Sequence, residues 1–282
     1  MQTVSTLPAL RKQVKAWRQQ NIQLAFVPTM GNLHQGHLSL VRKAKELADR
    51  VVVSIFVNPL QFDDKADLSA YPRTLDADIK QLSTVECDLV FMPSANIMYP
   101  DGMDKQTVIT VPGMDDKLCG RARPGHFDGV ATVVAKLFNM VQPDLAVFGE
   151  KDYQQLLLIK KMVTDLNMPI NVMGLPTCRE ESGLAMSSRN QYLTPQQRQQ
   201  AASLYQILNE IKDKLQSGNR NYIQLENYAI DKLETLGFDV DYVEVRKAEN
   251  LEVASASDKA LRILSAARLG KARLIDNIAC DL

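Results

Sequence analysis

Short apolar runs alternate with longer amphipathic segments over the first two thirds of the chain. The runs are rich in Val, Ile and Phe, which is typical of strands that are buried on both faces of a sheet. They span residues 22–27, 51–57, 88–92, 145–148 and 170–175. Between them, apolar residues recur at helical spacing within residues 38–48, 130–141 and 156–166. This succession predicts an α/β fold with a Rossmann-like, doubly wound parallel sheet.

The pattern changes after Pro176, where a polar stretch extends to Asn190. Thr194 followed by Pro195 is typical of a helix start, with Thr as the cap and Pro in the first turn. From there the spacing predicts two helical segments, which end near residue 236.

Three strand-like pieces close the chain, at residues 240–246, 261–267 and 272–278. Residues 268–271, between the last two pieces, are expected to form a hairpin turn. We therefore expect a Rossmann-like domain over residues 1–176 and a second, smaller α+β domain over residues 177–282.

The composition suits a globular protein with one large core or two modest ones, because 45% of the 282 residues are apolar. The 33 basic and 33 acidic residues balance, which argues against a broad surface for nucleic acid or for an anionic membrane. Local basic residues can still hold a phosphate group. The charge balance therefore argues against nucleic acid and anionic membranes as partners, but it does not argue against a local phosphate-binding site.

The cysteines and the N-terminal residues indicate a soluble, cytoplasmic protein. Cys87, Cys119, Cys178 and Cys280 are widely separated and form no C-x-x-C pair. Their spacing offers neither a zinc site nor a disulfide framework, and it suits a reducing compartment. The N-terminus lacks an apolar signal core, and no apolar stretch approaches the length of a membrane span.

The segment PTMGNLHQGH, residues 28–37, carries the clearest chemistry. It follows the first predicted strand and opens the first long helix, where free backbone N–H groups favour a phosphate. Gly31 and Gly36 permit a tight turn and close backbone approach. His34 and His37 lie three residues apart, so both imidazoles can point to one side. Two imidazoles beside a triphosphate can donate hydrogen bonds to oxygens that gain charge as pyrophosphate leaves.

Two plainer interpretations of these histidines stay open. They could belong to a surface loop, although two of the chain's three histidines in one glycine-bounded turn favour a site. They could also bind zinc, but no third Cys, His or acidic ligand is close in the sequence.

Polar residues also follow two other predicted strands, at the edge of the sheet where open α/β folds bind ligands. Asn58 and Gln61 follow the second strand, and a glutamine can both donate and accept hydrogen bonds. Lys151 and Asp152 open another helix; the lysine suits a phosphate and the aspartate a ribose. Gln155 lies one turn further and faces the same direction. As alternatives, Gln61 could be an ordinary loop residue and Asp152 a helix cap.

The H-x-G-H turn after the first strand resembles that of the nucleotidyltransferase superfamily, which includes class I aminoacyl-tRNA synthetases. Within it, FVPTMGNLHQGHLSLV at residues 26–41 closely resembles the pantothenate synthetase family, the pantoate–β-alanine ligases. Four further blocks resemble the same family: SIFVNPLQF at residues 54–62, RPGHFDGV at 123–130, FGEKDYQQ at 148–155 and AMSSRN at 185–190. The match runs from residue 26 to 193, and the remainder of the chain adds little that is diagnostic.

The resemblance implies an ATP-dependent ligase that condenses (R)-pantoate with β-alanine to pantothenate, in the biosynthesis of vitamin B5 and coenzyme A. Pantoyl-adenylate is the implied intermediate, and AMP and pyrophosphate are released. ATP is implied as a substrate with Mg²⁺ on its phosphates, without a tightly bound organic cofactor. The family also implies a homodimer, and we expect neither nucleic acid nor a membrane as a partner.

The resemblance assigns roles residue by residue. Residues implied to bind ATP are Met30, Gly31, Asn32, Leu33, His34, Gln35, Gly36, His37, Gly149, Glu150, Lys151, Asp152, Cys178, Met186, Ser187, Ser188 and Arg189. His37 is implied to stabilise the transition state, and the residues implied to assist it are His34, Lys151, Ser188 and Arg189. Gln61, Gln155 and Asn58 are implied to bind pantoate, and Gln61 also β-alanine.

The stretch MSSR at residues 186–189 resembles the second signature of the superfamily, a mobile loop that contacts phosphate, but it lacks the central lysine of tRNA synthetases. This departure favours the narrower family, in which Ser188 and Arg189 occupy the equivalent stretch. Two hydroxyls and a guanidinium suit an anionic oxygen. A serine-rich surface loop is the alternative.

Further features carry hypotheses of their own. His126 is expected to order the loop before a helix. Arg121 and Arg123 could attract an anionic substrate or belong to a solvated basic loop. Residues 62–78, which are polar and include Tyr71, form a candidate lid that would keep water from the mixed anhydride.

Rival functions share parts of this pattern. A nucleotidyltransferase that makes a dinucleotide cofactor would have the same turn and sheet, but residues 58–62 argue against it. A nucleotide sensor would bind ATP without turnover and would not need two imidazoles and an arginine at the phosphates. A tRNA-binding role is disfavoured by the missing lysine and by the lack of a basic domain.

Overall fold

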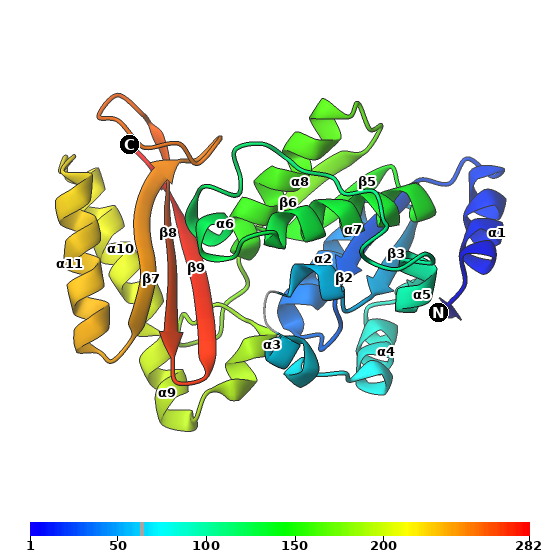
Figure 1. Ribbon diagram of the computed structural model, residues 1–282, viewed down its shortest axis with the longest axis horizontal. Helices are drawn as coiled ribbons and strands as arrows, with labels where there is room; N and C mark the ends of the chain where they lie inside the picture. Colours follow the sequence, from blue (N-terminus) through cyan, green and yellow to red (C-terminus); the bar gives the residue numbers. More distant parts are fainter. Residues whose placement is uncertain (63–64) are drawn as a thin grey trace.

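Two β-sheets organise the chain, a six-stranded parallel sheet and a three-stranded antiparallel sheet (Figure 1). The computed structural model describes residues 1–62 and 65–282. The strands of the large sheet are β1 (Gln2–Val4), β2 (Leu24–Thr29), β3 (Arg50–Ile55), β4 (Leu89–Phe91), β5 (Leu145–Gly149) and β6 (Asn171–Leu175). They lie in the order β1-β4-β3-β2-β5-β6. The five predicted strands and the doubly wound parallel sheet are confirmed.

Helices cover both faces of the large sheet, because successive residues of each strand point to opposite sides. Leu24 and Phe26 of β2 pack into a core with α1 (Leu7–Arg18), α7 (His126–Val141) and α8 (Tyr153–Asp165). Ala25 and Val27 pack on the other face, against α2 (Gln35–Leu47) and α4 (Leu75–Thr84). The shorter helices of this half are η1 (Pro59–Gln61), α3 (Lys65–Ala70), α5 (Ala95–Met98), α6 (Leu118–Ala122) and η2 (Glu150–Asp152).

The edge strand β1 was not among the predicted strands. It has three residues, of which only Val4 is buried, so neither an apolar run nor an alternation marks it. Its place is set by parallel pairing with β4, in which Thr3 lies opposite Val90. A strand this short is defined by its partner more than by its own sequence.

The small sheet packs between its own helices and the first half of the chain. Its strands β7 (Asp239–Lys247), β8 (Ala260–Leu269) and β9 (Ala272–Asp281) pair in this order. The helices of this half are η3 (Ser188–Tyr192), α9 (Pro195–Ala201), α10 (Ser203–Gln216) and α11 (Tyr222–Thr235). One face of the sheet shares a core with α10 and α11, and on the other face Tyr242 and Leu264 pack with Leu118 of α6.

Thr194 caps α9 as predicted, in a capping box with Gln197. Two details differ from the expectation. Three helices stand where two were expected, because α9 ends before Ala202 and α10 begins after it. β8 continues to Leu269, which pairs with Ala272, so the hairpin turn contains only Gly270 and Lys271.

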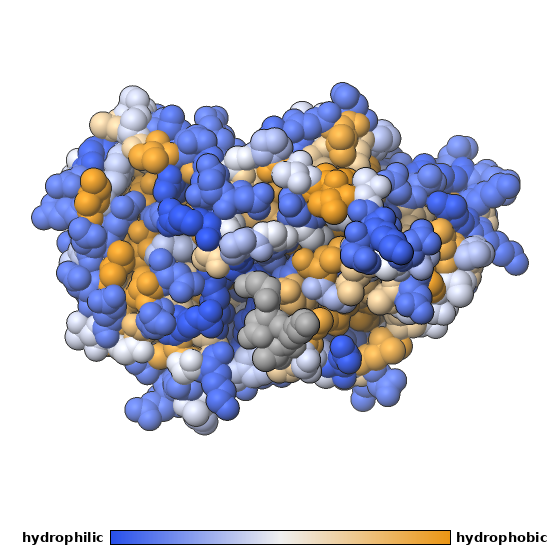
Figure 2. All heavy atoms as spheres, viewed as in Figure 1, coloured by the Kyte–Doolittle hydropathy of each residue, from blue (hydrophilic) through white to orange (hydrophobic). Residues whose placement is uncertain are grey.

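The division at residues 176 and 177 stays a prediction. The large sheet ends at Leu175, and Leu184 already packs into the core of the small sheet. On the face drawn in Figure 2, hydrophilic side chains predominate and hydrophobic ones form small patches, as is usual for a surface in contact with water. Over residues 1–62 and 65–282, no helix combines the length and the apolarity that crossing a bilayer requires.

Candidate active site

A cleft beyond the carboxyl ends of β2 and β5 gathers most of the predicted site residues, at the place where open α/β sheets bind ligands. It consists of two adjoining cavities, of about 220 Å³ and about 450 Å³. The predicted residues that line the smaller cavity are Met30, His34, Gly36, His37, Asn58, Gln61, Gly149, Lys151, Asp152, Gln155, Cys178, Met186, Ser187, Ser188 and Arg189. Within the described part of the chain, the predicted residues that line neither cavity are Gly31, Asn32, Leu33, Gln35 and Glu150.

The two histidines of the H-x-G-H turn lie side by side at the start of α2, with ring centroids 4.1 Å apart. His34 is the N-cap residue, and its Nδ1 accepts a hydrogen bond from the N–H of Gly36 at 3.1 Å. The Nδ1 of His37 accepts from the N–H of His34 at 3.3 Å. Because both Nδ1 atoms accept, each neutral ring carries its proton on Nε2.

Burial keeps both rings neutral. It is the main cause that lowers the pKa of His34 to about 4, with Lys151 as the next cause. It also lowers the pKa of His37 to about 3, with further contributions from His34 and Lys151. Near neutral pH the turn therefore presents two neutral imidazoles, each with one N–H to donate.

The buried carboxylate of Asp78, from α4, fixes the loop that precedes these histidines, and the sequence analysis missed it. Its two oxygens accept from the N–H groups of Asn32 at 2.9 Å and Leu33 at 2.8 Å. Gly31, in the left-handed region at φ +80°, turns close to the same carboxylate. The sequence offered no signal, because Asp78 lies more than forty residues downstream and reads as an ordinary acidic residue in the first turn of a helix.

Gly36 leaves room for the His34 ring. A Cβ atom at residue 36 would lie 2.9 Å from the Cε1 atom of His34 and 3.5 Å from the Cβ atom of Cys178. A side chain at residue 36 would therefore displace the His34 ring, whereas the distance to Cys178 is an ordinary van der Waals contact.

Gln61 is held at both its side chain and its backbone. Its Nε2 donates to the sulfur of Met30 at 2.9 Å, and its Oε1 accepts from Asn58 at 3.2 Å. Its carbonyl oxygen accepts from Nη2 of Arg123 at 3.1 Å and from Nδ1 of His126 at 2.8 Å. His126 therefore binds the backbone of η1 at Gln61, and its expected role in ordering the loop before a helix stays a prediction.

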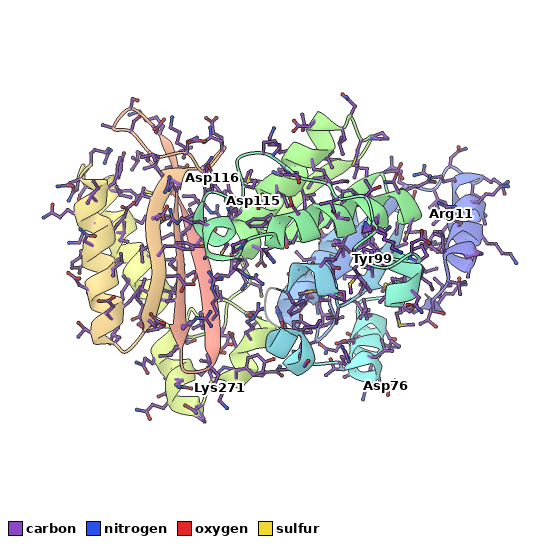
Figure 3. All side chains as sticks on the ribbon, viewed as in Figure 1. Arg11, Asp76, Tyr99, Asp115, Asp116 and Lys271 are labelled. Atoms are coloured by element: carbon purple, nitrogen blue, oxygen red, sulfur yellow. The ribbon has the colours of Figure 1, made fainter. Side chains whose placement is uncertain are left out.

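Asn58 is almost fully buried and bonded within the protein. Its Oδ1 accepts from the hydroxyl of Tyr99 at 2.7 Å, and its Nδ2 donates to the carbonyl oxygen of Gly129 at 3.1 Å. Figure 3 places Tyr99 in the first half of the molecule, on the segment near α5. A Cβ atom at residue 129 would lie 2.3 Å from the carbonyl oxygen of Leu60, so Gly129 lets α7 approach η1. These contacts suit Asn58 to orienting Gln61.

The two arginines before α7 have different surroundings. Arg123 lines the larger cavity and contacts Gln61. Arg121 is more than half exposed and pairs with Glu244 of β7 at 2.7 Å. The predicted attraction of anions therefore concerns Arg123 more than Arg121.

The turn at the end of β5 places Lys151, Asp152 and Gln155 along both cavities, as their spacing predicted. The Nζ atom of Lys151 lies 3.8 Å from a carboxylate oxygen of Asp152. The alternative that Asp152 caps the helix is wrong. It occupies the N-cap position of α8, but its side chain makes no capping hydrogen bond and is exposed, which leaves the carboxylate for a ligand.

The MSSR loop forms the opposite wall of the smaller cavity. Ser187 caps η3 by accepting from the N–H of Arg189 at 3.2 Å. Behind the loop, Asn190 is buried and donates to Glu180, which also holds Arg198 at 2.8 Å. The loop is thus ordered by the residues around it, which a solvated serine-rich loop would not be.

Thr177 is a lining residue that the sequence analysis missed. Its hydroxyl is buried in the smaller cavity, and no group in the described part of the chain bonds it. A buried hydroxyl normally has a partner. A ligand in this cavity would supply one.

The candidate lid is described only in part, since residues 63 and 64 lie outside the described residues. Tyr71 is buried beside the smaller cavity, and its ring packs edge-on against Phe62 at 5.5 Å. Burial raises the pKa of Tyr71, and a hydrogen bond to Ser188 partly opposes the rise. This segment therefore touches the MSSR loop; its motion stays a prediction.

The small sheet also reaches the cleft, which the sequence analysis missed. Asn277 of β9 donates to the carbonyl oxygens of Glu150 and Lys151, and Asp276 binds Arg179 ahead of the MSSR loop. Lys271, at the turn between β8 and β9, lines the larger cavity (Figure 3). These residues lie in the part of the sequence that carried no diagnostic motif.

Comparisons with known proteins agree with this geometry. The family model described as pantoate–β-alanine ligase matches residues 2–279. The pantothenate synthetases of Methylococcus capsulatus and Ectopseudomonas mendocina are 53% and 56% identical to the chain, and each alignment covers 100% of this chain and 99% of the relative. The crystal structure of pantothenate synthetase from Thermus thermophilus superimposes with a TM-score of 0.92 at 44% identity, over 99% of both chains. The pantoate–β-alanine ligase from Francisella tularensis, crystallised with β-γ ATP and β-alanine, gives 0.83 at 36% identity, over 99% of this chain and 97% of the other.

Proposed function

The chain belongs to the pantoate–β-alanine ligase family, and from this premise we propose how its cleft joins pantoate to β-alanine with ATP. The enzyme forms pantothenate from these substrates. The observation that carries the residue roles is the meeting of four groups around one cavity: the neutral His34 and His37, the cationic Lys151, and the MSSR loop.

Pantoate is proposed to bind in the smaller cavity, next to Gln61 and Gln155. The cavity has a polar end with these amides and an apolar floor from α7 that includes Val133 and Val134. Pantoate carries a carboxylate, two hydroxyls and, on the carbon between the hydroxyls, two methyl groups, so the amides can bind its polar groups while the valines contact the methyl groups. Asn58 then acts through its hydrogen bond to Gln61.

In the first step, a carboxylate oxygen of pantoate attacks the α-phosphorus of ATP and pyrophosphate leaves. The carboxylate is ionised at neutral pH, so this step needs no general base. The Nε2–H groups of His34 and His37, the ammonium of Lys151 and the donors of Ser188 and Arg189 surround the space for the phosphates. Fixed donors of this kind favour the transition state by stabilising charge as it develops.

In the second step, the neutral amine of β-alanine attacks the acyl carbon of pantoyl-adenylate. The new C–N bond forms, the C–O bond to AMP breaks, and the amine loses a proton. We propose that Gln61 holds the pantoyl group through both steps, because its two hydrogen-bonded anchors fix it at the junction of the cavities.

Mg²⁺ is proposed to reach the site on the phosphates of ATP, where it would neutralise charge on the leaving pyrophosphate. Within the described residues, no group of three or more His, Cys, Asp or Glu could hold a metal ion. The exposed carboxylate of Asp152, beside Lys151, would be available to such an ion or to the ribose of ATP.

A cytoplasmic enzyme that forms a homodimer is also part of this proposal. The homodimer is supported by the family alone, and the location by the family and by the widely separated cysteines, which suit a reducing compartment. The small molecules named above are the proposed partners.

The test is AMP release from ATP and pantoate with magnesium, measured with and without β-alanine. We expect AMP formation that depends on both substrates, with pantothenate appearing in step. AMP release that does not respond to β-alanine would refute the ligase activity. The Arg11→Ala variant, in exposed residue 11 of α1 (Figure 3), serves as the matched control and should behave like the wild type.

A further inference from the structure

Two adjacent residues of β9, Asp276 and Asn277, bind two of the segments that line the proposed ATP cleft. Both side chains are buried, with 3% of their surface exposed. Buried polar side chains that are fully bonded fix the geometry of the groups they touch. Asp276 and Asn277 therefore fix the positions of the two segments of the cleft that they bind.

Asn277 binds the turn that carries Lys151. Its Nδ2 donates to the carbonyl oxygens of Glu150 at 2.9 Å and Lys151 at 2.8 Å. Its Oδ1 accepts from Nε of Arg262 at 2.5 Å, and Arg262 also pairs with the carboxylate of Glu150 at 3.1 Å. The Asn277 amide thus donates one hydrogen bond to each of two successive carbonyl groups of the turn.

Asp276 binds the segment that leads to the MSSR loop. It accepts two hydrogen bonds from Arg179, at 2.6 Å and 2.9 Å. Arg179 pairs as a β-bridge with Ala185, immediately before Met186. The N–H of Asn277 also donates to Asp276 at 2.7 Å, so the two anchors are joined.

We propose that Asn277 is a positioning residue for adenylate formation: it holds the Lys151 turn in register with the MSSR loop across the phosphates. The proposal rests on the proposed function. Asn277 acts through Lys151, so its loss should impair adenylation while leaving pantoate binding intact, since its amide hydrogen bonds go to Glu150, Lys151 and Arg262.

The test is the Asn277→Asp variant. It keeps the size of the side chain and an oxygen for Arg262, but replaces the donating NH₂ with an oxygen that faces two carbonyls. Pantoate-dependent exchange between ATP and pyrophosphate reports adenylation alone. We expect this exchange to fall about 100-fold, the loss that a misplacement of about 1 Å can cause, with the Kd for pantoate unchanged by calorimetry.

A double-mutant cycle with Lys151→Ala separates positioning from general damage. If Asn277 acts through Lys151, the double variant should be no worse than Lys151→Ala alone. Ile278→Val is the matched control: it alters the next residue of β9, which packs in the core of the small sheet, and should leave exchange unchanged. If Asn277→Asp does not fold, Asn277→Ser, whose side chain is too short to reach both carbonyls, replaces it.

Additive losses in the cycle, or equal losses of exchange and of pantoate affinity, would overturn the inference. Wild-type protein without pantoate-dependent exchange would instead refute the proposed function, so the two failures can be told apart.

Discussion

Two walls of the proposed ATP cleft, the His34–His37 turn and the MSSR loop, are built in different ways. The His34–His37 turn is anchored by hydrogen bonds from its own backbone N–H groups to its two imidazoles and by the buried carboxylate of Asp78, all within one half of the chain. The MSSR loop is anchored by charged pairs, in which Arg179 binds Asp276 and Glu180 binds Arg198. One wall is therefore complete within the large sheet and its helices, and the other depends on the small sheet.

This difference bears on how the site can move. A turn whose anchoring hydrogen bonds all lie within one domain keeps its shape whenever that domain is folded. A loop held by β9 changes position with the small sheet, and interdomain contacts are the usual place for such motion. We infer that the histidines are the fixed reference of the site and the MSSR loop its adjustable part.

Asp276→Asn is expected to give the largest effect and the largest difference between the two walls. The partly buried guanidinium of Arg179 would lose the buried carboxylate that pairs with it, so we expect the free energy of unfolding to fall by about 3 kcal/mol in urea denaturation. Cleavage by proteases should increase around residues 179–189 and not around residues 28–37. A double variant, Arg179→Met with Asp276→Asn, should recover part of the lost free energy of unfolding. An equal rise in cleavage at both walls would show that the two walls are not anchored differently.

His37→Ala tests the fixed wall. Removing one preorganised donor should lower the rate of adenylation by about 100- to 1,000-fold. Pantoate-dependent pyrophosphate exchange measures this rate, and pantoate affinity should hold. Arg42→Ala, on the exposed side of the same helix, is the control and should retain the wild-type rate. A loss below tenfold would show that His37 is not the main stabilising group.

Acid should affect the two walls in different pH ranges. The folded protein lowers the pKa of His34 to about 4 and of His37 to about 3, so between these values and 6.5 the unfolded chain binds protons that the folded chain does not. Stability is therefore full above pH 6.5 and falls with pH, by about 1 kcal/mol per histidine between pH 6 and pH 5. The pKa of Glu180 is lowered from 4.5, mainly by its bond to Arg198, so that pair weakens only at lower pH.

Urea denaturation at pH 6 and pH 5 measures this difference. A variant with His34→Asn and His37→Gln should lose about 2 kcal/mol less stability than the wild type over this step. Equal slopes for the two proteins would mean that the histidines are not buried in neutral form.

Arg198→Ala gives the smallest expected effect. Its pair with Glu180 is more than half exposed on the arginine side, so stability should fall by only about 0.2–1 kcal/mol. Because Glu180 also accepts a hydrogen bond from Asn190 behind the loop, we expect a higher KM for ATP with little change in kcat. High salt should mimic the variant in the wild type; a larger drop in kcat than rise in KM would place this pair closer to the chemistry.

The sequence was most informative where periodicity and chemistry are local. The four inner strands β2 to β5 were visible because their apolar runs are buried, and the edge strand β6 was visible as an apolar run although none of its residues is fully buried. The histidine turn was visible because Gly31, His34 and Gly36 lie within six residues of sequence. The cap Thr194 was visible for the same reason. The strand β1 was not, because only Val4 of its three residues is buried.

The residues that the sequence analysis missed act across long separations. Asp78 reaches back more than forty residues to the loop at residue 32, and Asn277 reaches 126 residues back to Lys151. Each looks ordinary beside its sequence neighbours, because the partner that gives it a role is supplied only by the fold. For Asp152 the error was the reverse: its position suggested a helix cap, but its side chain makes no capping hydrogen bond.

The contact between Gly129 and Leu60 has a consequence for anyone who wishes to re-engineer the enzyme for larger acids. Helix α7 touches η1 so closely at residue 129 that even one methyl group there would push the η1 backbone, and Gln61 with it, out of place. One turn further along the same helix, Val133 and Val134 line the cavity with side chains alone. Shortening those two would deepen the chamber and spare its polar end, so a designer should begin there and leave residue 129 untouched.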